Sequence, residues 1–255
     1  VGSGTATGVD IKTATGGTIS LNAGGVLTLA GDATVQATGS SARLAAVGDV
    51  TLGAVTAANV SVVSTGGAII SAVGSTKNVT ATNLMLTADD AIGTSAKHLT
   101  TDVVTITARS TGTDSAGVYV SEDSAITVDT VSVTVTEFTS TAGTSVVTDA
   151  KQSDLSAGNN GSIVLRTTNG SITLNDGTAA ASGEYNPAGV AVSAGGSGSV
   201  LLSAGDTNAV KVADVNINAD VTSGTGHITV KAADAIVVGS GTATGVDIKT
   251  ATGGT

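Results

Sequence analysis

A short motif recurs along this chain, and its spacing limits the folds that the chain can adopt. The motif is a glycine followed by aliphatic residues at alternating positions. It occurs as GTISL (17–21), GVLTL (25–29), GDVTL (48–52), GSIVL (161–165), GSITL (170–174), GSVLL (198–202) and GHITV (226–230). Gly170, Gly198, Gly226 and Gly254 follow one another at a constant 28-residue interval. A fixed period of this length is typical of repeat architectures, in which each row of the chain stacks on the next.

A second, longer repeat joins the two ends of the chain. Residues 1–18 and 238–255 have the same sequence, VGSGTATGVDIKTATGGT, at a 237-residue offset. This identity predicts a tandem array, with one unit over 1–237 and the start of the next unit over 238–255. Gly254 is the copy of Gly17, so the 28-residue rhythm crosses the boundary without a linker. We expect the preceding and following units to be end-to-end partners, and the chain to be an interior piece of a longer protein.

Each row contains short runs in which aliphatic and polar residues alternate. The row from Gly226 has such runs at 228–230, 236–238 and 246–248, and the row from Gly198 has them at 200–202, 210–212 and 215–217. Alternation with a period of two is the signature of a half-buried strand. The pattern predicts an all-β chain that folds as a three-sided parallel β-helix, or β-solenoid. We expect roughly 24–28 residues per coil, a length typical of solenoid repeats, and about nine coils per 237-residue unit.

The middle of the unit is less regular. ANVSVV (58–63) and TNLMLT (82–87) are separated by a 24-residue interval and are predicted to be equivalent strands. Residues 139–157 are predicted to form a loop or a loosely formed coil. Residues 182–189 contain Pro187, the one proline, and are predicted to bulge from their coil, because proline is poorly tolerated inside a ladder.

The composition agrees with a narrow stacked core and excludes several classes of protein. Only 1% of the residues are aromatic, namely Tyr119, Phe138 and Tyr185, and a narrow interior has little room for such rings. Without cysteine there is no disulfide framework or thiolate metal site. The net charge of -10 argues against nucleic acid as a partner. No apolar run approaches the roughly 18 residues of a membrane helix, so no membrane span is expected.

Several segments resemble the filamentous-haemagglutinin-like exoproteins and giant repetitive surface adhesins of Gram-negative bacteria. They are GGTISLNAGGVLTLAG (16–31), DDAIGTSAKHLTTDVVTITA (89–108), NGSITLNDG (169–177) and SGTGHITVKA (223–232). The resemblance lies in rhythm and composition and covers most of the chain. It implies a secreted protein that forms a long right-handed parallel β-helix and is poor in cysteine.

The sequence offers few residues for catalysis or for binding a cofactor. Right-handed β-helix enzymes gather carboxylates on one exposed sheet, whereas the acidic pairs here, Asp89–Asp90 and Glu122–Asp123, fall at predicted strand ends. Aspartate favours such turns for backbone reasons alone. We therefore expect no enzyme and no catalytic, cofactor-binding or metal site, apart from incidental Ca²⁺ at acidic turns. His98 and His227 are expected to be surface residues.

The expected function is mechanical: a structural or adhesive filament module, one unit of a long rod on a bacterial cell surface or released from it. Residues 139–157 or 182–189 could then protrude to contact other filaments, the cell surface or host glycans. The alternative is a carbohydrate-binding or carbohydrate-processing β-helix domain, which needs aromatic platforms or clustered carboxylates on one face.

Overall fold

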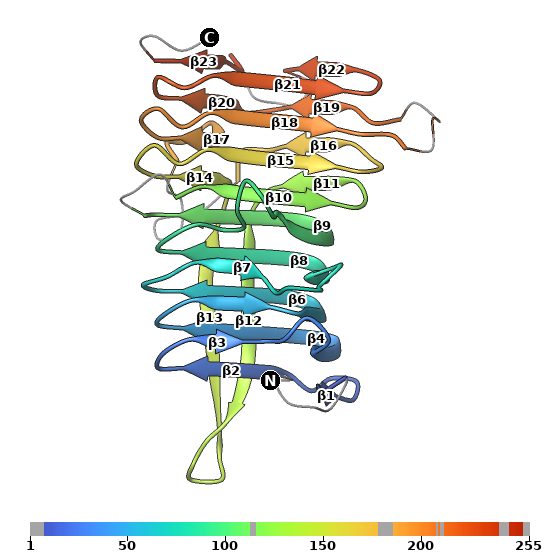
Figure 1. Ribbon diagram of the computed structural model, residues 1–255, viewed down its shortest axis with the longest axis vertical. Helices are drawn as coiled ribbons and strands as arrows, with labels where there is room; N and C mark the ends of the chain where they lie inside the picture. The colour runs from blue at the N-terminus through green and yellow to red at the C-terminus, as the bar shows by residue number, and fades with distance from the viewer. Residues whose placement is uncertain are drawn as a thin grey trace.

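A computed structural model describes residues 8–112, 116–177, 186–207, 209, 212–239 and 245–251 (Figure 1). The described chain is all-β, as predicted, and most strands belong to one large, mainly parallel sheet. The strands are β1 (Asp10–Thr13), β2 (Ile19–Ala23), β3 (Leu27–Thr28), β4 (Thr34–Ala46), β5 (Val50–Leu52), β6 (Ala54–Ser64), β7 (Ile69–Ser71), β8 (Val79–Ala88), β9 (Leu99–Ser110), β10 (Val118–Glu122), β11 (Ile126–Val128), β12 (Val131–Phe138), β13 (Thr144–Gln152), β14 (Leu155–Ala157), β15 (Ile163–Thr167), β16 (Ile172–Leu174), β17 (Val190–Ala194), β18 (Val200–Ala204), β19 (Val215–Ile217), β20 (Asp220–Ser223), β21 (Ile228–Ala232), β22 (Ile236–Val238) and β23 (Ile248–Thr250).

The strands stack along the long axis of the molecule (Figure 1). The register of the parallel pairings aligns aliphatic residues in columns through the stack. One column can be followed through successive parallel pairings: Leu27, Val50, Ile69, Ile92, Val118, Ile163, Val200 and Ile228. The six inner members are at most 2% exposed. The alternation seen in the sequence is therefore the alternation between this buried column and the outer face.

The distance along the chain between successive levels of this column varies more than predicted. A 23-residue interval joins Leu27 to Val50, a 19-residue interval joins Val50 to Ile69, and a 28-residue interval joins Val200 to Ile228. The predicted coil length of 24–28 residues therefore describes the last step of this column but is too long for the first two. This column has eight levels within the described residues, and the column from Ile19 to Val238 has nine, in agreement with about nine predicted coils. Two steps of the first column are much longer than the others. These are the 45-residue step from Val118 to Ile163 and the 37-residue step from Ile163 to Val200.

The recurrent glycine of the motif marks a close approach between successive levels. A Cβ on Gly198 would lie 2.0 Å from the carbonyl oxygen of Gly161, and a Cβ on Gly226 would lie 2.1 Å from that of Gly198. A Cβ on Gly161 would lie 1.6 Å from the carbonyl oxygen of Ala116. No side chain can be accommodated at these distances, so only glycine fits at this corner of the stack.

The prediction of a loop or loose coil over 139–157 is wrong. Residues 144–152 form β13, which pairs antiparallel with β12 in a hairpin. This hairpin lies across the stacked strands instead of adding a level to them (Figure 1). It is an insertion into one strand position, because Val128 pairs with Ile106 and the chain returns at Leu155, which pairs with Ala108. The insertion accounts for the 45-residue step.

The hairpin is fastened to the outer face of the N-terminal levels. Val131 and Val133 are buried with Met85 of β8 in a small apolar cluster. Arg43 of β4 donates through Nε to both carboxylate oxygens of Asp149, at 2.9 and 3.0 Å. The hairpin thus connects levels that are separated along the chain.

Two further predictions concern single rows. The equivalence of 58–63 and 82–87 is confirmed, since Asn59 pairs with Asn83. In the row from Gly198, however, the third strand is β20, not the run at 210–212. Val212 lies outside any strand and is 62% exposed, and residues 210 and 211 lie outside the described part. Of the bulge predicted over 182–189, residues 182–185 lie outside the described residues, and 186–189 form a turn before β17, with Pro187 outside any strand.

Candidate functional site

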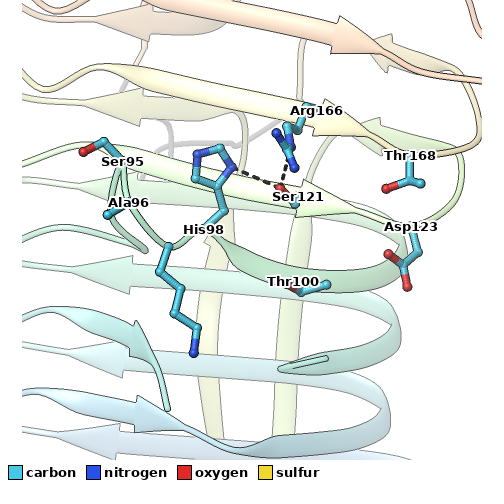
Figure 2. Close-up of a pocket in the computed structure, with 9 residues that line it drawn as sticks. Ser95, Ala96, His98, Thr100, Ser121, Asp123, Arg166 and Thr168 are labelled. Carbon is cyan, nitrogen blue, oxygen red and sulfur yellow. Dashed lines mark hydrogen bonds between the residues drawn. The ribbon is translucent and has the colours of Figure 1, made fainter. Parts of the chain in front are cut away.

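A polar groove lies where the chain leaves the stack between Ile92 and Leu99 (Figure 2). Ile92 pairs with Val118 and Leu99 pairs with Val120, so the intervening segment projects from the stack as a short loop. The groove has a volume of about 360 Å³. Its lining includes Ser95, His98, Ser121, Asp123, Arg166 and Thr168. These residues come from three levels of the stack, which explains why they are distant in sequence.

Ser121 is the hydrogen-bonding centre of this groove. Arg166 donates from Nε to Ser121 Oγ at 2.8 Å, and His98 Nδ1 lies 3.0 Å from the same oxygen (Figure 2). A hydroxyl has one hydrogen and two acceptor sites, so Ser121 accepts from Arg166 and can either donate to His98 Nδ1 or accept from it, according to the tautomer of the ring. Burial, with a smaller contribution from the Arg166 charge, lowers the pKa of His98 and favours the neutral ring.

A charged network borders the groove on the N-terminal side. Lys77 Nζ lies 3.0 Å from Asp102 and 2.9 Å from Asp123. Hydrogen bonds to Asp123 and Asp102 raise the pKa of Lys77, and the hydrogen bond from Lys77 lowers the pKa of Asp102. The lysine is engaged by two carboxylates, so it links neighbouring levels and does not face a ligand alone.

The residues of the groove are typical of a small polar binding site and lack a feature that a nucleophilic centre requires. A serine nucleophile needs a histidine base that is itself oriented by a third group. Within the described residues, His98 has its hydrogen bond to Ser121 and a ring contact with Tyr119 at 5.9 Å, but no carboxylate partner. The guanidinium of Arg166, the carboxylate of Asp123 and the paired rings offer weak recognition of a polar ligand.

One buried carboxylate was not predicted from the sequence. Glu122 is 0% exposed. Its carboxylate accepts a hydrogen bond from Thr101 Oγ1 at 2.7 Å and from the backbone nitrogens of Val103, at 3.1 Å, and Ser124, at 3.0 Å. The side chain thereby satisfies a backbone donor at the end of a ladder. Burial raises the pKa of Glu122, against the opposing effect of these hydrogen bonds.

The other residues considered for chemistry do not gather. Asp89 and Asp90 are exposed after β8, and Asp89 accepts a hydrogen bond from Thr111. His227 is exposed, whereas His98 is half-buried in the groove, contrary to the expectation of a surface residue. Among the described residues, no three His, Asp or Glu side chains lie in an arrangement that could hold a metal ion.

Comparison with protein-family models, with curated proteins and with solved structures finds no match to this chain. In the part of the chain that the structure describes, no helix is long and apolar enough to cross a membrane.

Proposed function

We propose that the chain is one unit of a tandem right-handed, three-sided β-solenoid that forms a continuous extracellular rod at a bacterial surface, as in the adhesins that the sequence resembles. In this proposal the module has a structural or adhesive role, with no catalysis, cofactor or nucleic acid. Its principal partners are the preceding and following units.

The observation that carries the proposal is the position of the duplicated segment at both ends of the stack. Residues 11–13 lie in β1, where they pair with β4 at the N-terminal end. Their copies, residues 248–250, form β23 and pair with β20 at the C-terminal end. Both pairings are parallel. Superposing the two copies places β20 of one unit beneath β1 of the next, so the ladder that ends at β20 continues into the ladder that begins at β1. Within one unit these are two different ladders, because β23 follows the ladder that starts at Leu21 of β2.

The exposed surface at the C-terminal end supports the same proposal. Ile236, Val238 and Ile248 belong to the last strands, yet they are 41–49% exposed. Their counterparts in earlier levels, such as Val215 and Val221, are 0% exposed. Another level on top would bury these side chains, at a gain of about 25 cal/mol per Å² of apolar surface.

Electron microscopy of chains built from two, four and six repeats tests this function. The proposal predicts unbranched rods of constant width whose length increases in proportion to repeat number. Globular particles, or beads whose mutual angles vary freely, would contradict it. Each repeat should add about 40 Å, because strands in a stack are about 4.8 Å apart.

A carbohydrate-binding module is a second candidate, favoured by the rings of Tyr119 and His98 beside Arg166 and Asp123. On a glycan array, Tyr119→Ala and Arg166→Ala should each abolish binding of the protein to any glycan that the unmodified chain binds. Val146→Ala, at a 68% exposed position on β13 that is not part of the groove lining, is the control. Absence of binding by the unmodified chain, or binding that survives both changes, would reject this candidate.

A further inference from the structure

The tip of the β12–β13 hairpin extends past β2 at the N-terminal end of the stack (Figure 1). Its last contacts with its own unit are made by Thr136, whose carbonyl oxygen accepts from Thr18 Oγ1, and by Glu137, which accepts from Ser20 Oγ at 2.6 Å and Asn22 Nδ2 at 2.8 Å. A strand advances about 3.3 Å per residue, so a few residues beyond Glu137 span roughly two strand spacings of the stack. The tip therefore extends beside the position that the last strands of the preceding unit would occupy below β2.

An apolar side chain on this overhang borders the empty position. Phe138 is 77% exposed, although it is one of three aromatic residues in the chain. It lines a groove at the end of the stack together with Ile19 and Leu21 of β2. These β2 residues belong to the columns of the core, so a strand placed beneath them would also pass beside Phe138.

The rhythm of the sequence identifies the strand that belongs there. Ile228 and Ile19 each stand two positions after a motif glycine, Gly226 and Gly17, and the copy of Gly17 follows Gly226 at the 28-residue interval. Strand β21 of the preceding unit should therefore pair with β2, in the same register as β18 with β21. In that register the preceding unit's Thr229 lies beside Ser20, and its Lys231 lies beside Asn22.

The outer face of that strand belongs to a groove that suits the tip. Tyr119, Val164, Leu201 and Thr229 occupy successive levels in one outward column and line this groove. The three residues that precede Thr229 in this column are half-buried, and Lys231 also lines the groove. An apolar surface with a cation at its edge thus lies where an aromatic ring and a carboxylate would arrive.

We propose that the hairpin is a clasp between repeats: its tip docks on the preceding unit, with Phe138 against Thr229 and Leu201 and with Glu137 beside Lys231. The groove belongs to the preceding copy of this chain and its occupant is the hairpin tip of the following copy, and the inference rests on the proposed continuous stack. Each junction would then be held by strand pairing inside and by the clasp outside, which resists bending and slippage of one unit on the next.

The test uses a chain of two repeats, into which pairs of cysteines are introduced, because the protein has no cysteine of its own. The clasp pair is Thr229→Cys in the first repeat with Phe138→Cys in the second, joined by a short bifunctional maleimide. The stack pair is Thr229→Cys in the first repeat with Ser20→Cys in the second, joined by oxidation. Val73→Cys replaces Phe138→Cys in the matched control.

The clasp predicts rapid crosslinking of the clasp pair and of the stack pair, with at least tenfold slower reaction of the control. Crosslinking of the stack pair without the clasp pair would overturn the clasp and leave the continuous rod intact. Failure of both pairs would overturn the continuous stack, and the clasp with it. Equal rates for the clasp pair and the control would show only random encounters, and would also overturn the clasp.

Discussion

At the scale of single residues, the stack is specified by positions that leave no alternative. Gly161, Gly198 and Gly226 approach the backbone of the level below so closely that a Cβ would overlap a carbonyl oxygen. Glu122 differs from these glycines, because its side chain is large and polar and is held inside the stack by hydroxyl and backbone donors. Each type of residue gives a separate prediction.

Gly198→Ala should destabilise the fold by about 1–3 kcal/mol, because overpacking at a site without free space forces the backbone to shift. Gly25→Ala is the matched control, since nothing lies within 4 Å of the position of its Cβ. The control should change stability by less than about 0.5 kcal/mol. Urea unfolding followed by circular dichroism measures both variants. Equal effects would show that the close approach does not determine the choice of glycine.

The stability of Glu122→Gln relative to the unmodified chain should increase as the pH rises. The pKa of Glu122 in the folded state is raised above its ordinary value of 4.5, so the folded state binds a proton more tightly than the unfolded state. The contribution of Glu122 to stability therefore falls as the pH rises from 4.5 through the raised pKa. Glutamine has no such titration.

The measurement is the difference in unfolding free energy between Glu122→Gln and the unmodified chain, over a series of pH values from below 4.5 to neutrality. Taking the difference cancels the titration of the other carboxylates. A difference that is constant, or that changes in favour of the unmodified chain as the pH rises, would contradict the burial argument.

The sequence predicts the role of the glycines better than the burial of Glu122 or the arrangement of the groove residues. The glycine positions were evident because the motif that contains them recurs, but the 28-residue rhythm placed Gly198 on Gly170, whereas the structure stacks Gly198 on Gly161 and Ile172 on Val215. The burial of Glu122 could not be foreseen, because it depends on the backbone nitrogen of Val103 taking a side-chain acceptor in place of a ladder partner. Ser121 and Arg166 are partners on successive levels, but the inserted hairpin separates them by 45 residues, so no regular interval relates them in the sequence.

At the scale of elements, the hairpin is the one part of the described fold that departs from the stacked pattern. Strand β12 carries the alternation of a half-buried strand in VSVTVTEF (131–138). Strand β13 has no such signal, because TSVVTDAKQ (144–152) is largely exposed and does not need an apolar face. A surface strand that pairs with only one neighbour does not need alternating apolar residues, so its sequence carries little strand signal. Its role as a fastening across levels is apparent only from its contacts.

Asp149→Asn should loosen the hairpin without unfolding the stack. The pair with Arg43 is largely shielded, with side chains 15% and 13% exposed, and hydrogen bonds to charged groups contribute about 1.5–3 kcal/mol. Hydrogen exchange should accelerate in β12 and β13 and remain unchanged in β15 and β18. Asp234→Asn, at an exposed turn, is the control and should change neither region. Uniform acceleration along the whole chain would contradict a local fastening.

At the scale of the whole molecule, the proposed rod is long, narrow and strongly anionic. The terminal copy, residues 238–255, contains one Asp and one Lys, so a complete unit also has a net charge of -10. Charge of one sign, repeated about every 40 Å along the stack, opposes side-by-side contact between rods. The exposed ends, by contrast, favour end-to-end continuation.

Lateral association of rods built from several repeats should therefore depend on ionic strength. At 0.01 M salt the Debye length is about 30 Å and repulsion extends beyond a rod's surface, whereas at 1 M it is about 3 Å. Light scattering should report separate rods at low salt and bundles at high salt. Bundles that form equally at both concentrations would show that charge does not control lateral contact.

The most direct test of the account is a cryo-electron microscopy structure of the junction between two repeats. The continuous stack predicts that Val221 of the first repeat pairs with Ile11 of the second, and that Ile228 of the first pairs with Ile19 of the second. The strand spacing of about 4.8 Å should continue across the boundary without interruption. A gap in the ladders, a flexible linker or a variable angle between the two repeats would contradict the account.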